Sequence, residues 1–201
     1  GFSYERRCPM TKASTETALQ SAMTALLRTR PLQKLTVGEI ARAAGVSRVT
    51  FYHYYRDLYD LAGAVLAGEM ERAMGADQTP ENWEEGLLRL MRTMRENRWL
   101  IGKISASDGW GQIERMLHET VFRQVMAVAE GFPDTGAPED DRVFAAHFYE
   151  HALTGLIFSW AGSGMKEEPE TVVRRLAVML TGQLETALRQ FGAAAKEEKP
   201  C

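Results

Sequence analysis

The sequence predicts an all-α protein. Apolar residues recur every three or four positions in successive segments, which is the spacing that gathers them on one face of an α-helix. Ser, Thr or Asp precedes several of these segments, and Gly or Pro follows them, as helix starts and stops require. No segment shows the apolar and polar alternation of a half-buried strand, and no internal repeat is present.

Composition indicates a folded globular chain of one large domain or two small ones. Apolar residues make up 45% of the 201 residues, which is ample for a core. No apolar run approaches the roughly 18 residues of a membrane span, and no secretory pattern opens the chain, so a cytoplasmic protein is expected. Cys8 and Cys201 are the only cysteines, so neither a disulfide framework nor a cysteine metal motif is expected.

The first helix is expected to begin at Thr11 or Ser14 and to end at about Arg28. Residues 1–10 have no helical periodicity and are expected to be disordered, with Met10 as a candidate for the natural start. The apolar stripe of this helix consists of Leu19, Ala22, Met23, Leu26 and Leu27.

Two short helices joined by a tight turn are predicted next. Thr36 and Glu39 form a capping box, in which each side chain satisfies a free backbone amide at a helix start. Ala41 leaves room for a steep helix crossing, and Gly45 supplies the left-handed conformation that ends the first helix. Ser47 caps the second helix. This helix-turn-helix pattern is typical of proteins that read DNA.

The second helix of this pair has two faces. Val49, Phe51 and Tyr54 are expected to point inward, and Tyr55 is also assigned to the core. The outward face is polar or cationic and suits base edges and phosphates. It carries Arg48, Thr50, Tyr52 and His53.

Charge is distributed unevenly along the chain, although the net charge is only −3. Residues 1–60 hold nine Lys and Arg against five Asp and Glu, whereas the remainder holds fifteen against twenty-two. A mildly basic first part and an acidic second part suit a chain that meets DNA at one end.

The rest of the chain is also expected to be helical. Asp57 caps a helix that runs to Met74, and amphipathic or apolar segments follow over residues 83–96, 98–105, 110–129, 141–162 and 169–191. About nine helices result. The expected domains are a head of residues 11–56 and a body of residues 57–191, followed by a disordered tail over 192–201.

These features resemble the TetR/AcrR family of bacterial transcriptional regulators. The resemblance extends from about Thr11 to Leu66, and it implies a homodimer with a three-helix head that binds an operator duplex. The helical body is then expected to dimerise and to bind a small-molecule effector, without a cofactor. The motifs that carry the resemblance are Leu35-Thr36-Val37, Ala43-Ala44-Gly45-Val46-Ser47, Thr50-Phe51-Tyr52 and Tyr55-Arg56-Asp57.

By this resemblance, Arg48 and Thr50 contact base edges. Arg can bond guanine in a bidentate manner, and Thr offers a hydroxyl and a methyl group to thymine. The implied phosphate anchors are Thr36, Ser47, Tyr52 and His53. Lys12, Lys34, Arg42 and Arg56 are expected to add attraction that does not depend on sequence, with a solvated surface charge as the alternative for each of them.

One position departs from the family pattern. The family often places Lys just after the fourth-helix cap, whereas this chain has Leu58 followed by Tyr59. A usual phosphate contact is therefore missing, and Arg56 is the nearest cation that could replace it.

An effector site is expected among the aromatic and Met side chains of the body, since these suit an adaptable apolar pocket. The same spacing also describes an ordinary core, and no ligand class follows from it. The candidates are Met94, Trp99, Ser105, Trp110, Met116, His147, Phe148 and His151.

His147 and His151 stand one helical turn apart, with Glu150 beside them. Two histidines are too few for zinc, which takes four ligands as a rule, so no metal site is predicted. His118 could join them only if the fold brought it there.

The resemblance implies that the last two helices pair with those of a second copy in a four-helix bundle, although an internal core stripe would show the same pattern. A dimer is expected because one small head reads too few base pairs for useful specificity. The expected face holds Ala152, Leu153, Gly155, Leu156 and Ser159, together with Val172, Leu176, Met179, Leu180, Gln183 and Leu184.

The sequence therefore predicts a DNA-binding regulator, a repressor that a small molecule releases from a palindromic operator. An activator or a partner-controlled regulator of the same fold stays open as an alternative. A helical interaction module and an enzyme are less favoured, because no catalytic motif is present.

Overall fold

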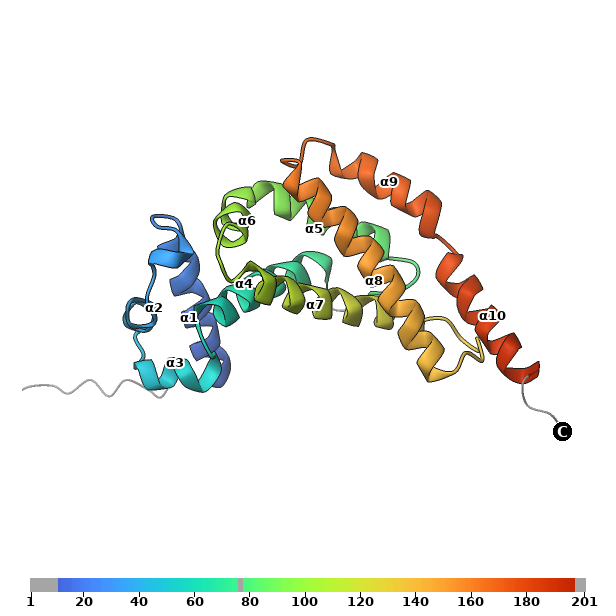
Figure 1. Ribbon diagram of the computed structural model, residues 1–201, viewed down its shortest axis with the longest axis horizontal. Helices are drawn as coiled ribbons and strands as arrows, with labels where there is room; N and C mark the ends of the chain where they lie inside the picture. Colours follow the sequence, from blue (N-terminus) through green and yellow to red (C-terminus); the bar gives the residue numbers. More distant parts are fainter. Residues whose placement is uncertain (1–10, 76–77, 198–201) are drawn as a thin grey trace, which may run out of the picture. The chain divides into compact units, whose positions relative to one another are not determined.

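The computed structural model describes residues 11–75 and 78–197. Within these residues every regular element is helical, which confirms the predicted all-α class (Figure 1). None of the described helices has both the length and the apolar character of a bilayer-spanning segment. The first four α-helices are α1 (Lys12–Leu27), α2 (Val37–Ala44), α3 (Arg48–Tyr54) and α4 (Leu58–Met74), with a single 3₁₀ turn at Leu32–Lys34. They are followed by α5 (Trp83–Glu96), α6 (Arg98–Ser105), α7 (Trp110–Glu130), α8 (Glu139–Gly162), α9 (Pro169–Leu180) and α10 (Gln183–Glu197).

The chain forms two compact units, and α4 and α7 each contribute to both. The first unit runs up to Val65 and adds Trp99–Ile113, whereas the second combines Leu66–Arg98 with the chain from Glu114 onward. The units therefore do not follow the predicted boundary at residue 57. The difference arises because residues far apart in the sequence pack together within one unit. Such long-range contacts leave no periodic signal in the sequence.

Hydrogen bonds hold the segment around α6 in the first unit. Gln33 Nε2 donates to the carbonyl of Ala106 at 2.8 Å, and Lys103 Nζ donates to the carbonyl of Arg28 at 3.3 Å. The Arg28 guanidinium also lies over the ring of Trp99, 4.8 Å from its centroid. Residues more than 60 positions apart are thus joined within one unit.

The single helix predicted over 169–191 is two helices in the structure. Thr181 is extended and Gly182 has a φ of +76°, a left-handed conformation that costs glycine little. After this break α10 continues to Glu197, so residues 192–197 are helical and the prediction of disorder is wrong for them. The predicted disorder of 1–10 and 198–201 lies outside the described residues.

Gly192 brings the last turns of α10 close to the loop before α8. Gly192 is buried against the loop before α8, and a Cβ atom there would lie 2.0 Å from the carbonyl oxygen of Thr135. Only a residue without a side chain allows this approach, which attaches the end of α10 to the second unit.

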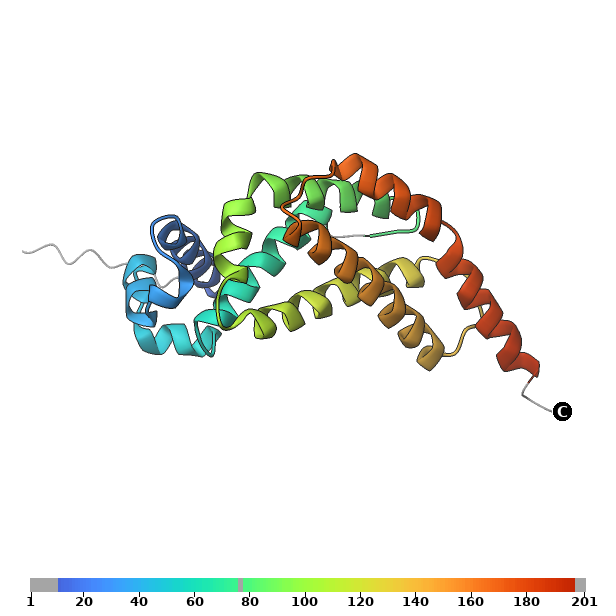
Figure 2. The ribbon, with the colours of Figure 1, turned by 45° about the horizontal axis from the view of Figure 1, so that its top comes forward.

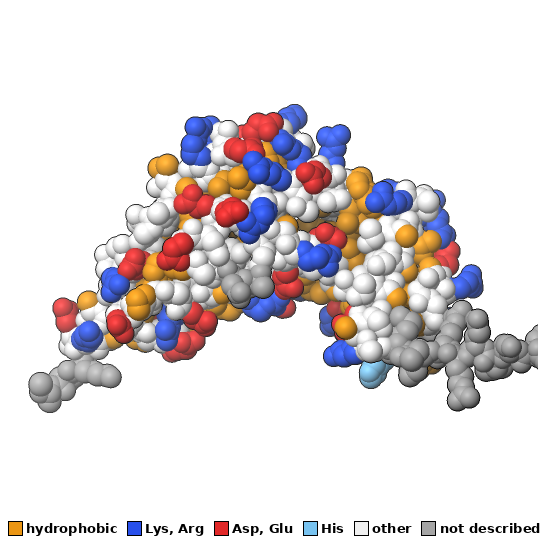
Figure 3. Space-filling model, turned by 180° about the vertical axis from the view of Figure 1, so that it is seen from behind, with side chains coloured by type: hydrophobic (Ala, Val, Ile, Leu, Met, Phe, Trp, Pro, Cys, Tyr) orange, Lys and Arg blue, Asp and Glu red, His pale blue; other side chains and the backbone are white. Residues whose placement is uncertain are grey.

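Helices α5 and α9 lie side by side in the second unit (Figures 1 and 2). Arg92 pairs with Glu170 and Arg95 with Glu168, each at 2.6 Å. Figure 3 shows basic and acidic side chains close together along the upper edge of the face it draws. Exposed pairs of this kind contribute about 0–1 kcal/mol each, so the stability of the contact comes mainly from buried apolar side chains. These include Leu87, Leu90, Met91, Val173 and Leu176.

Candidate DNA-binding face and effector cavity

The predicted capping box starts α2. Thr36 Oγ1 accepts a hydrogen bond from the Glu39 amide at 3.3 Å, and the Glu39 carboxylate accepts from the Thr36 amide at 2.9 Å. Arg30 pairs with the same carboxylate at 2.7 Å and is the main reason why the pKa of Glu39 lies below its usual value. The start of α2 is therefore fixed by the Thr36 hydroxyl and by a Glu39 carboxylate whose lowered pKa keeps it ionised at neutral pH.

The predicted turn orients α3 against α2. Gly45 has a φ of +70°, and the Val46 amide donates to the carbonyl of Ala41 at 2.9 Å. Ala41 is buried where the two helices cross. The small side chain and the left-handed glycine thus set the direction in which α3 leaves the turn.

Side chains on the inner side of α3 anchor it in the first unit. Phe51 is fully buried and Tyr55 nearly so, which confirms both core assignments. Gln20 Nε2 donates to the Tyr55 hydroxyl at 3.1 Å, and this bond ties the end of α3 to α1. At the other end, Ser47 Oγ accepts from the Thr50 amide at 3.0 Å. Packing on one side and a cap at the start therefore hold the helix.

The outer side of α3 is exposed along its length. Arg48, Tyr52 and His53 are exposed, as predicted. Val49 was expected to point inward, but 81% of it is exposed. Phe51 and Tyr55, four positions apart, set the buried side, and Val49 lies about 200° around the helix from Phe51. The spacing of Phe51 and Tyr55 in the sequence could therefore have shown that Val49 lies on the exposed side.

The cations near this face differ in their partners. Arg48 forms no ion pair within the described residues, so its guanidinium is available to a ligand. Arg56 instead pairs with Asp60 at 3.3 Å, and its backbone amide donates to the same carboxylate at 2.9 Å. Lys34 is exposed at the end of the 3₁₀ turn. A phosphate contact from Arg56 must therefore compete with Asp60.

Val49→Ala is expected to weaken binding to a cognate duplex by about 1 kcal/mol, because an exposed valine at this place can cover a thymine methyl group. The thermal midpoint should stay unchanged, since the side chain is exposed in the free protein. Fluorescence anisotropy with cognate and scrambled duplexes measures the effect. An equal loss on both duplexes would show that Val49 does not contribute to sequence preference.

The eight predicted effector residues are not brought together. Trp99, Ser105 and Trp110 belong to the first unit, and Trp99 packs against Arg28. Phe148 is 64% exposed on α8. His147 and His151 line a shallow hollow between α7 and α8, whereas Met94 and Met116 are half-buried elsewhere in the second unit. None of the eight lines the cavity that the second unit contains.

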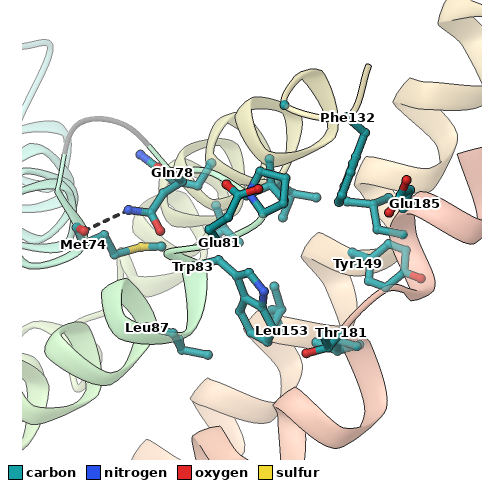
Figure 4. Close-up of a pocket in the computed structure, with 18 of the residues that line it drawn as sticks. Met74, Gln78, Glu81, Trp83, Leu87, Phe132, Tyr149, Leu153, Thr181 and Glu185 are labelled. Atoms are coloured by element: carbon teal, nitrogen blue, oxygen red, sulfur yellow. Dashed lines mark hydrogen bonds between the residues drawn. The ribbon is translucent and has the colours of Figure 1, made fainter. Parts of the chain in front are cut away.

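That cavity has a volume of about 450 Å³ and is called the body cavity below. Its walls come from α5, α7 and α8, and from the segments around the start of α5 and the break between α9 and α10 (Figure 4). Its volume falls within the roughly 300–1,000 Å³ that is usual for small-molecule sites. The apolar lining consists of Met74, Pro80, Trp83, Leu87, Leu90, Val121, Val125, Val128, Phe132, Pro133, Leu153, Ile157, Leu180 and Leu184.

A few polar groups interrupt this apolar lining. Gln78 Nε2 donates to the carbonyl of Met74 at 2.8 Å, as the dashed line in Figure 4 marks. The buried Oε1 atoms of Gln78 and Gln124 have no hydrogen-bond partner in the part of the chain that the structure describes. Burial raises the pKa of the Tyr149 hydroxyl, which therefore stays protonated. The lining thus offers two acceptors that lack donors, the hydroxyls of Tyr149 and Thr181, and the carboxyl groups of Glu81 and Glu185.

Two family models match the chain. Residues 20–65 match the model of bacterial regulatory proteins of the tetR family, and residues 81–182, about half of the chain, match the model of a transcriptional regulator C-terminal region. The chain belongs to the TetR family of bacterial transcriptional regulators. Members of this family are DNA-binding regulators and not enzymes, and they act as dimers that bind operators and small-molecule effectors.

Individual relatives of this TetR-family regulator are distant. The dhaKLM operon transcriptional activator DhaS of Lactococcus lactis subsp. lactis (strain IL1403) is 23% identical over 116 residues, or 55% of this chain. The match spans 62% of that relative's length.

Three solved structures share the fold. The dihydroxyacetone kinase operon activator DhaS has a TM-score of 0.61 and 18% identity, with 86% of this chain and 97% of that chain covered. A TetR regulator from Rhodococcus sp. RHA1 has a TM-score of 0.57 and 18% identity, covering 86% and 98%. The repressor AlkX from Dietzia sp. strain DQ12-45-1b has a TM-score of 0.52 and 19% identity, covering 89% and 100%. These similarities confirm the fold of the TetR-family regulator.

Proposed function

We propose that this TetR-family regulator is a repressor that binds a palindromic operator as a homodimer and leaves it when a small molecule fills the body cavity. One observation carries the proposal: the first unit presents an exposed α3, and the second contains a cavity of ligand size. Helices α4 and α7 contribute to both units, so a change around the cavity can reach the first unit through continuous helices.

In this proposal the exposed side of α3 enters the major groove. Arg48, Val49 and Thr50 stand at its start, where they can reach base edges. The Thr50 hydroxyl lies 2.8 Å from that of Ser47, so one of them can donate onward to a base or a phosphate. The phosphate contacts come from the exposed groups around them, namely Thr36, Ser47, Tyr52, His53, Lys34 and Arg56.

The dimer face is proposed on the exposed apolar side chains of α8 and α9. Several residues of the predicted face are not available, because Leu153 and Leu180 line the cavity and Leu176 and Leu184 are buried. Exposed apolar patches of this kind mark interaction surfaces. Leu156 of α8 and Met179 of α9 belong to the predicted face and are exposed. The structure adds three more exposed apolar side chains, Phe144 and Phe148 of α8 and Val178 of α9.

The proposed effector is a mainly apolar molecule with at least one hydrogen-bond donor and no negative charge, since Glu81 and Glu185 add carboxyl groups to the lining. The lining is largely apolar, and the unpaired Oε1 atoms of Gln78 and Gln124 need donors. Such a ligand shifts the protein toward the conformation that binds the ligand better. By linkage, the ligand lowers the affinity for the operator by the same factor by which the operator lowers the affinity for the ligand.

An activator is the second candidate, because the DhaS structure that shares this fold carries that function in its name. A promoter reporter distinguishes the two, since deleting a repressor raises expression and deleting an activator lowers it. Either regulator works on operator DNA, so we place it in the cytoplasm.

Arg48→Ala tests the DNA-binding half of the proposal, with Arg42→Ala as the matched control on α2. Loss of a bidentate guanine contact should cost about 1–3 kcal/mol on the cognate duplex and little on a scrambled one. Arg42→Ala should weaken both duplexes to the same small extent, as loss of a non-specific charge does. Anisotropy titrations at fixed salt measure these affinities. Equal losses on both duplexes for Arg48→Ala would contradict the assigned role.

A further inference from the structure

Helices α7 and α8 bring together three side chains that bind metals. His118 comes from α7, whereas Glu150 and His151 are neighbours on α8. One ligand atom from each lies within 4.8 Å of the others. The sequence alone could not show whether His118 joins the α8 residues. The structure places it beside Glu150, 32 positions further along the chain.

Glu150 carries a carboxylate that is buried inside the protein. It is 1% exposed, and burial of a carboxylate is costly unless it is paired. His118 Nδ1 contacts Glu150 Oε1, and His151 Nδ1 lies 2.6 Å from Glu150 Oε2. Thr154 Oγ1 donates from 3.0 Å to Oε1. Each carboxylate oxygen thus faces one imidazole, and a hydroxyl one turn further along α8 helps to orient the group.

The cluster is reachable from outside. The side chains of His118 and His151 are 31% and 69% exposed, and they open onto the shallow hollow between α7 and α8. Arg115, Glu119 and Arg123 supply the other charges there, and Arg123 is engaged by Glu71 at 2.9 Å. An ion can therefore enter from solvent and meet two nitrogens and a carboxylate.

We propose that His118, Glu150 and His151 bind one divalent transition-metal ion, with zinc as the ion to test. Two imidazoles and one carboxylate form a donor set that suits first-row metals such as zinc and does not suit calcium or magnesium, which prefer oxygen ligands. The positive charge of the ion compensates the buried Glu150 carboxylate. Three protein ligands leave a fourth position for water or a small ligand.

The distances require only local adjustment. Zinc holds nitrogen and oxygen ligands at about 2.0–2.2 Å, so ligand atoms around one ion lie roughly 3–4 Å apart. Two of the three ligands are exposed enough to rotate toward this arrangement, while Glu150 stays in place. The inference concerns α7 and α8 alone and does not depend on operator binding.

Titration of the full chain with zinc, followed by calorimetry, tests this site. Cys8→Ser and Cys201→Ser are introduced first, because thiols also bind zinc. One zinc ion per chain is expected, and His118→Ala and His151→Ala should each weaken binding by more than the roughly 10–100-fold that loss of an outer-shell partner costs. Glu150→Gln should weaken it too, and magnesium should not compete. His53→Ala, on α3, should leave binding unchanged.

His147→Ala separates this site from a surface chelate. His147 and His151 are one turn apart, and such a pair could bind zinc without His118. The His147 ring stacks on Phe122 with centroids 4.3 Å apart, so the proposed site should retain zinc in His147→Ala. Binding that survives His118→Ala but not His147→Ala would overturn the proposal, and so would absence of binding to the parent chain. Circular dichroism verifies that each variant is folded.

Discussion

Phe51→Ala should lower the free energy of unfolding by about 3–5 kcal/mol and abolish duplex binding. Phe51 is fully buried and forms an edge contact with the Tyr52 ring, 5.5 Å between centroids, and a tilted contact with Tyr55 at 6.0 Å. Truncation to alanine removes this packing and leaves a cavity beneath a helix of seven residues, which is too short to persist without tertiary support.

Matched variants separate this effect from loss of a DNA contact. Phe51→Leu keeps most of the volume and should retain measurable binding. Val49→Ala, on the outer side of the same helix, should not change stability. Urea unfolding followed by circular dichroism gives the stability change, and anisotropy gives the affinity. A Phe51→Ala protein that unfolds at the parental urea concentration would contradict the assignment of Phe51 to the core.

Leu153→Trp should weaken ligand binding in the body cavity at least about tenfold while leaving duplex affinity intact. Leu153 lies on α8 and lines the cavity (Figure 4). An indole there occupies space that a ligand needs within a cavity of about 450 Å³. N-phenyl-1-naphthylamine is a suitable probe, because it is uncharged, mainly apolar and fluorescent, and it carries one N–H donor.

The parent protein is expected to enhance the fluorescence of this probe with saturation, and Leu153→Trp should weaken its binding at least about tenfold, in proportion to the lost apolar contact. Leu153→Met is the matched control, because it keeps an apolar side chain of similar volume. The same probe should weaken operator binding by the parent and not by Leu153→Trp. Equal probe affinity in both proteins would mean that the probe binds elsewhere.

Local features of the fold could be predicted from the sequence because caps and turns act within a few residues. Thr36 with Glu39, Gly45 and Ser47 give the bounds of α2 and the start of α3 directly. The short helix α3 was harder to assign by face, since seven residues hold only one complete hydrophobic repeat. Val49 was therefore placed inside, although Phe51 and Tyr55 define the buried side.

The sites of the second unit depend on contacts that no local pattern records. The aromatic stripe around Trp99 and Trp110 was assigned to an effector pocket, but these residues pack in the first unit. The cavity is lined instead by Leu153, Leu180 and Leu184, which were assigned to the dimer face from the sequence, and by residues such as Gln78 and Thr181 that lie outside any stripe. The break at Gly182 was missed for a similar reason, because one glycine inside a helical pattern is compatible with a continuous helix.

Selection of bound duplexes from a random pool, by the parent protein and by Arg48→Ala in parallel, tests operator recognition most directly. The parent should enrich an inverted repeat whose half-sites match a two-fold dimer, and addition of a ligand for the body cavity should reduce the bound fraction. Arg48→Ala should not enrich the same repeat. Failure of the parent to enrich any sequence, or equal enrichment by both proteins, would contradict operator recognition through α3.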